Sequence, residues 1–213
     1  MYLQHKLKNW LYRHFKDNFL VYFTIIVFLI IGIIIGAVSI RILDSDQKGQ
    51  VISFFNSFFK LISNDEVDSF LLLKESILNN LKTIFLIWIT GIIIIGIPII
   101  PIIILLRGFA IGFTVGFLVN EFGIKGLLFA LFSILPQNLF VIPGIISISS
   151  IGMVNSLNSI RRKRLQSTYN HKLTNFINYS VIIFIFSIII MIGSLVEAYI
   201  TPIFMRLITD YIY

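Results

Sequence analysis

The chain has 213 residues, of which 57% are hydrophobic and only 13% are charged, and its formal net charge is +7 at pH 7. With a mean hydropathy of +0.95, this composition excludes an ordinary soluble domain and indicates an integral membrane protein. The sequence contains 0 Cys, which excludes a disulfide framework and a thiolate metal site. Because Lys and Arg gather in cytoplasmic segments of membrane proteins, we interpret the positive charge as a topology signal and expect no nucleic-acid partner.

Apolar stretches dominate the chain, and in order they cover 19–40, 83–106, 108–120, 127–153 and 176–200. All but the third are long enough to cross a hydrocarbon core of about 30 Å as single helices. The third is either a short glycine-rich spanning helix or a re-entrant segment. The sequence therefore predicts an all-α integral membrane protein with a single polytopic domain over 1–213. Its fold would be a bundle of five transmembrane helices, some kinked and some packed through glycines, with an amphipathic helical outer segment.

The charges favour five crossings. The tail 1–18 and the loop 154–175 are basic and are expected in the cytoplasm, whereas 41–82 has no basic excess and is expected outside. A path with five crossings places all three segments on their expected sides and leaves the carboxyl terminus outside. A path with four crossings would place the tail and the basic loop on opposite sides of the membrane. In this scheme the second helix ends at the inner boundary. The expected cytoplasmic topology anchors are Arg107, Arg161, Arg162, Lys163 and Arg164.

The outer segment 41–82 is predicted to form two amphipathic helices. Apolar residues between Val51 and Ile62 recur at spacings of three and four, and Ser63 with Glu66 forms a capping box that begins the second helix. Such helices either cover the outer surface of the protein itself or offer a docking platform for a partner. The candidate docking residues are Phe54, Phe55, Phe58 and Phe59.

Two sets of glycines predict close helix packing. Gly32 and Gly36 are spaced by four residues in the first stretch, and Gly108, Gly112 and Gly116 continue the same spacing over three positions. Four residues are about one helical turn, so each set forms a bare stripe on one helix face. In lipid, a bare stripe lets another helix backbone approach closely.

Polar residues also interrupt the apolar stretches. Pro136 is expected to kink the fourth stretch next to Gln137 and Asn138. These amides would either hydrogen-bond between helices or bind a ligand at a broken helix. Glu197 either reaches the outer interface or pairs with a polar group elsewhere in the bundle.

No pattern of catalytic residues is present in the sequence. It has no HExxH, no GxSxG and no P-loop, and its His residues lie in predicted cytoplasmic segments. We therefore expect no enzyme activity, no catalytic residue, no metal and no cofactor.

Three motifs together resemble the stage II sporulation protein M family. They are RGFAIGFTVGFLVN at 107–120, LPQNL at 135–139, and GSLVEAY at 193–199 followed by Pro202. The resemblance covers nearly the whole chain and implies endospore formation in Gram-positive bacteria of the Bacillus–Clostridium type.

In that family the protein is regarded as a membrane scaffold of the engulfment machinery. The implied partners are sporulation proteins D and P, which degrade peptidoglycan, together with the lipid bilayer; a homo-oligomer is also compatible. The implied location is the mother cell side of the sporulation septum. The alternative function is a transporter or channel-like permease subunit that binds solute between kinked helices.

Overall fold

The computed structural model describes residues 13–63, 68–164 and 170–212, and every regular element within these ranges is a helix. In chain order the elements are α2 (Phe19–Ser39), the 3-10 turn η1 (Ile40–Ile42), α3 (Ser45–Ser63), α4 (Ser69–Ile92), α5 (Gly96–Arg164), α6 (Asn170–Leu195), the π-helical turn η2 (Val196–Ile200) and α7 (Thr201–Ile212). The expected all-α fold is thereby confirmed.

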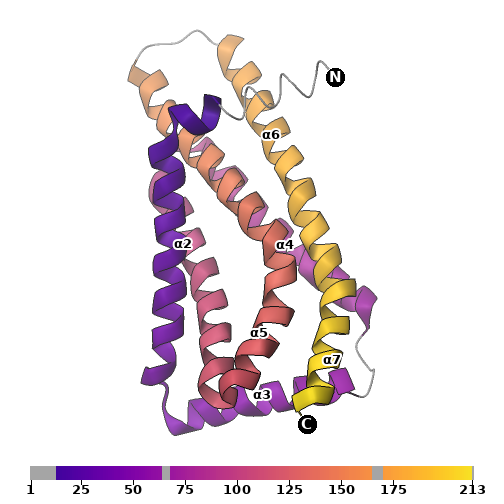
Figure 1. Cartoon of the computed structure of the whole chain (residues 1–213). Coiled ribbons are helices and arrows are strands. Elements are labelled where there is room, and N and C mark those ends of the chain that lie inside the picture. The colour runs from indigo at the N-terminus through magenta and orange to yellow at the C-terminus, as the bar shows by residue number, and fades with distance from the viewer. Residues whose placement is uncertain (1–12, 64–67, 165–169, 213) are drawn as a thin grey trace.

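Helix α5 reverses direction at Gly123, where the backbone has φ 58° and ψ −134°. A side chain strains this conformation, so glycine is the residue expected at such a reversal. The two arms, 96–122 and 124–164, run antiparallel: Gly126 lies against Leu118, and farther along Gly152 lies against Ile100. Figure 1 shows the arms as a tall hairpin beside α2. The arm 96–122 extends the short predicted stretch 108–120 at both ends.

The stretch 83–106 is not one helix, which corrects the expected boundaries. Helix α4 ends at Ile92, Ile93 is extended, and α5 begins at Gly96. A Cβ atom at Gly96 would overlap the Thr90 carbonyl, so this tight turn depends on glycine. Because the turn comes about three helical turns before Arg107, that residue lies inside the first arm of α5 and not at a helix end.

The expected second amphipathic helix is also absorbed into α4. Residues 69–92 form one helix, whose amino terminus is capped by Asp68: the carboxylate accepts a hydrogen bond of 2.8 Å from the backbone N–H of Phe70. The predicted capping residue Glu66 lies outside the described residues. Residues 69–82 therefore belong to the bundle and not to a separate outer helix.

Among the residues that the structure describes, three helical segments are long and apolar enough to cross a membrane: Phe19–Ile42, Gly96–Ile160 and Thr174–Arg206. The second contains both arms of α5. Helix α4 is less apolar because it carries Lys74, Glu75 and Lys82. The chain thus has the helices of a multi-pass membrane protein.

The two predicted glycine sets face each other between α2 and the first arm of α5. A Cβ atom on any of these glycines would meet the opposite helix, most often its backbone: Gly32 meets Leu105, Gly36 meets Phe109, Gly108 meets Leu29, Gly112 meets Ile33, and Gly116 meets Ala37 and Ile40. Because the numbers rise together on both helices, the two run parallel. Without side chains between them, the backbones reach the close approach that stabilises helix pairs in lipid.

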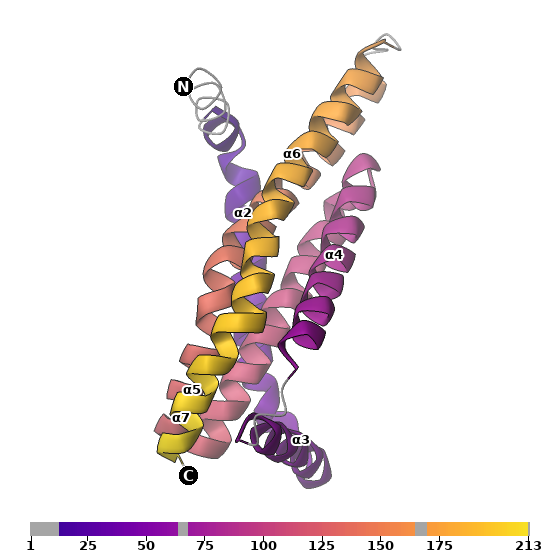
Figure 2. The same cartoon turned by 90° about the vertical axis from the view of Figure 1, so that its right-hand side faces the viewer.

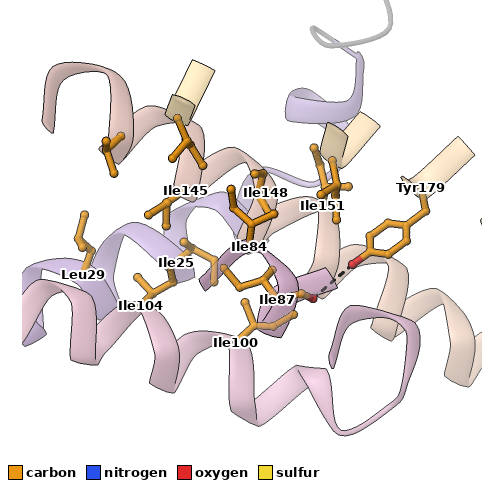
Figure 3. Packing of buried hydrophobic residues seen from close by; sticks show 13 residues of the cluster. Ile25, Leu29, Ile84, Ile87, Ile100, Ile104, Ile145, Ile148, Ile151 and Tyr179 are labelled. Carbon is orange, nitrogen blue, oxygen red and sulfur yellow. Dashed lines mark hydrogen bonds between the residues drawn. The ribbon is translucent and has the colours of Figure 1, made fainter. Parts of the chain in front are cut away.

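Isoleucines fill the space between α4, α5 and α6. Ile87, Ile100, Ile104 and Ile148 are each 0% exposed, and Figure 3 shows them interleaved. At the edge of this cluster the Tyr179 hydroxyl donates to the backbone carbonyls of Ile87 and Trp88, at 3.3 and 3.0 Å. This contact ties α6 to α4.

Helix α3 lies across the end of the bundle where the carboxyl terminus is found (Figures 1 and 2). Phe55 is only 9% exposed and stacks on Phe117 of α5, with ring centroids 5.4 Å apart. Phe55 therefore anchors α3 to its own bundle, and its ring is not exposed there for the docking contact that the sequence predicted. Phe54 is 66% exposed. The side chains of Phe58 and Phe59 lie outside the described residues.

We expect Gly112→Ala to destabilise the folded protein by about 1–3 kcal/mol, because the added methyl overpacks a backbone contact. The matched control is Gly49→Ala in α3, where nothing lies within 4 Å and the better helix former should be neutral or stabilising. Denaturant titration in detergent micelles measures both. Equal stability of Gly112→Ala and the parent would contradict the packing assignment.

Candidate functional site

A polar cavity of about 360 Å³ lies between α4, both arms of α5 and η2. The residues of its lining that carry the argument are Ser76, Asn79, Asn80, Arg107, Gln137 and Glu197. Its surroundings are mainly apolar helices, in which polar groups are rare and usually functional. We therefore treat this cavity as the candidate site.

Arg107 starts a chain of hydrogen bonds across the bundle. Its Nη2 donates to Oδ1 of Asn80 at 2.6 Å, and Nδ2 of Asn80 donates to the Ser194 hydroxyl at 2.9 Å. Asn80 is 2% exposed and Ser194 is 0% exposed. The amide of Asn80 thus uses both its acceptor and its donor inside the core, and it links α4 to α5 and α6.

Glu197 lies in the π-helical turn η2 at the lower end of α6. Such turns insert an extra residue into a helix and are frequent at functional sites. The carboxylate accepts a hydrogen bond of 2.5 Å from Ser76 of α4. Of the two alternatives for Glu197, the structure therefore shows pairing with a polar group elsewhere in the bundle.

Arg107 and Glu197 share the cavity without a direct ion pair between them. They are close enough for an electrostatic attraction, but the guanidinium bonds Asn80 and the carboxylate bonds Ser76. The cavity thus presents one cation and one anion, each held by an uncharged partner on α4.

The Pro136 region supplies the opposite wall of the cavity. Pro136 lies inside α5, and the following amides both line the cavity. Asn138 satisfies its own Nδ2 by donating to the Ile134 carbonyl at 2.8 Å. Gln137 Oε1 is buried and has no hydrogen-bond partner among the described residues.

The sequence interpretation missed the α4 side of the site, Ser76, Asn79 and Asn80. The sequence pattern places these residues in the outer segment 41–82. The available signal was the spacing of Ser76 and Asn80, which places two polar side chains on one face of a helix whose neighbours are apolar. Helix α5 (Figure 1) ends with the backbone of the four predicted topology anchors, Arg161, Arg162, Lys163 and Arg164. The side chains of these four residues lie outside the described part of the structure.

The described part of the chain has no group of three or more His, Asp or Glu residues that could hold a metal ion. What the fold and cavity define is an all-helical, multi-pass membrane protein with a buried polar cluster.

A sequence model of one family, stage II sporulation protein M, matches residues 25–202. The chain belongs to this family, as its motifs indicated, and membership implies a role as a membrane protein in sporulation. No curated protein and no solved structure is significantly similar to the chain.

We expect Asn80→Leu to destabilise the protein by about 3 kcal/mol, because it leaves the partly buried Arg107 without its hydrogen-bond acceptor. Adding Arg107→Leu should recover part of this loss. Asn79→Leu, at the exposed neighbouring position, is the control and should change stability little. A double-mutant cycle read by denaturant titration in micelles tests the pair. Strict additivity of the two single losses would refute the coupling.

Proposed function

We propose that this protein is a non-enzymatic membrane scaffold that recruits peptidoglycan hydrolases to the septal membrane during forespore engulfment. The observation that carries the proposal is α3, a helix that lies across one end of the bundle and exposes an aromatic residue there. Family membership supplies the biological setting. The proposed partners are sporulation proteins D and P.

One face of helix α3 packs against the bundle, and the adjoining face is exposed. Phe55 and Phe117 stack within an apolar cluster that also includes Ile40 and Phe129, and this cluster holds α3 to the bundle. On the adjoining face Phe54 stays exposed among polar residues such as Gln50 and Ser53. An aromatic residue surrounded by a polar rim has the composition of an interface hot spot.

The proposed topology has five crossings, by α2, α4, the two arms of α5, and α6. Parallel α2 and the first arm of α5, the hairpin at Gly123 and the turn after Ile92 are all compatible with this path. With the basic segments in the cytoplasm, α3 and Gly123 lie on the cell-wall side. Hydrolases that act on peptidoglycan work on that side.

Cysteine labelling tests this topology directly, since the parent chain has 0 Cys. We expect Ile124→Cys, next to the Gly123 reversal, to react with an impermeant maleimide added to intact cells. Ile95→Cys, in the turn before α5, should react only after permeabilisation. Both positions are exposed, at 79% and 58%. Labelling of Ile95→Cys from outside would contradict five crossings.

For the scaffold role, we expect Phe54→Ser to reduce recovery of sporulation protein D with the tagged protein at least about tenfold, as loss of a hot-spot aromatic would. Ile42→Ser is the matched control, because Ile42 is 79% exposed and ends the 3-10 turn η1, shortly before α3 begins at Ser45. Both variants should insert normally. Undiminished recovery with Phe54→Ser would reject this docking surface.

The polar cavity favours a second candidate, a permease subunit that binds solute next to Gln137 and Asn138. A separate energising subunit would then be required. Changing both residues to Leu distinguishes the two functions. A scaffold should keep its partners after this change, whereas a permease should lose flux.

A further inference from the structure

We propose that the cavity lined by Arg107, Gln137 and Glu197 binds a zwitterionic group, meaning one that carries an anionic oxygen group and a protonated amine a few bonds apart. The site lies in the bundle, away from α3, so it does not depend on the proposed docking of hydrolases.

Arg107 has hydrogen-bonding capacity that its protein partner does not use. A guanidinium carries five N–H donors, and in the described part of the chain Arg107 uses one of its nitrogens, on Asn80. Arg107 is itself one of the residues that line the cavity. Anionic oxygens, above all carboxylate and phosphate, are the acceptors that match a guanidinium best. One side of the cavity is therefore suited to an anionic group.

Two other lining residues, Gln137 and Glu197, carry acceptor oxygens with unused capacity. Gln137 Oε1 is buried with no donor among the residues described. The Glu197 carboxylate accepts one bond from Ser76, and a carboxylate has about four acceptor positions. Both oxygens call for N–H or O–H donors. A protonated amine offers up to three donors and a positive charge.

Charge balance decides between the ligand classes. Arg107 and Glu197 contribute one charge of each sign to the cavity. A purely anionic ligand would be repelled by Glu197, and a purely cationic one by Arg107. A zwitterion compensates both at once. The volume of about 360 Å³ also exceeds what a bridging water needs, since a water occupies about 30 Å³.

The position of the cavity opening allows two sources for such a zwitterionic group. Asn79 and Ala110 line the cavity and are exposed, so the opening lies between α4 and the first arm of α5, on the side of the bundle. A phospholipid with an ethanolamine headgroup and a small soluble zwitterion would share the same chemistry there. The experiment has one arm for each source.

In the soluble arm, the purified full-length protein in micelles is titrated calorimetrically with glycine, with sn-glycero-3-phosphoethanolamine and with sn-glycero-3-phosphocholine. In the lipid arm, the protein is reconstituted with phosphatidylglycerol plus either phosphatidylethanolamine or phosphatidylcholine. Retained lipids are then counted by native mass spectrometry. The choline compounds are the chemical control, because their quaternary nitrogen keeps the charge but has no N–H donor.

The most informative variant is Gln137→Leu. No hydrogen bond is lost, because Gln137 Oε1 has no partner within the described ranges, so the variant should fold at least as well as the parent. It should nevertheless weaken binding of the ethanolamine compound about tenfold and abolish the preference over choline. Arg107→Gln and Glu197→Gln should each weaken binding at least tenfold. Arg41→Gln, at an exposed arginine outside the cavity, should leave binding unchanged.

Binding in either arm with this pattern of variants supports the site, and the arm in which it occurs identifies the source. Absence of binding in both arms by the folded protein would overturn the proposal. Equal binding of choline and ethanolamine compounds, unaffected by Gln137→Leu, would overturn it too. Hydrolase recovery is measured separately on α3, so failure of one proposal does not imply failure of the other.

Discussion

The arrangement depends on the backbone contact between α2 and the first arm of α5. In lipid, helices gain no hydrophobic energy by associating, so close packing has to hold them together. Five glycines provide it, because four of them lie against the backbone of the opposite helix and Gly116 lies against Ala37 and Ile40. Because neighbouring residues on a helix point about 100° apart, fixing Gly108 against α2 turns Arg107 toward α4, where its guanidinium meets Asn80. The packing stripe therefore also orients the polar site.

Helix α4 is arranged to suit this site. Its buried residues Ser76 and Asn80 are polar, whereas its exposed residues include Leu78, Leu81 and Phe85. This pattern is the reverse of a water-soluble amphipathic helix and fits a helix with lipid outside and a polar cluster inside. The same face becomes apolar toward the end of the helix, where Ile84 and Ile87 join the isoleucine core. One helix thus contributes to both the structural core and the cavity.

Much of this fold was predictable from the sequence, because glycine spacing and long apolar runs reflect local geometry. The all-helical class and the identity of the packing glycines follow from those patterns. The turn after Ile92 could not be predicted from the sequence, since it lies within a continuous run of isoleucines. The inward orientation of Phe55 could not be predicted either, because periodicity alone does not decide which of two adjacent aromatic residues faces the bundle. The site required tertiary structure: Asn80, Arg107 and Glu197 are distant in sequence and meet only after three helices pack.

In the proposed topology, Arg107 lies deep inside the membrane domain and not at its boundary. Spin-label accessibility at Leu106, its neighbour and 59% exposed, tests this most directly in reconstituted vesicles. Labels at Ile95 and Ile124 serve as references for the two ends of the first arm. We expect the label at 106 to collide with oxygen but to be shielded from a water-soluble nickel chelate, which should reach both references. Equal access of the nickel chelate to 106 and 95 would place Arg107 at the boundary and contradict the account.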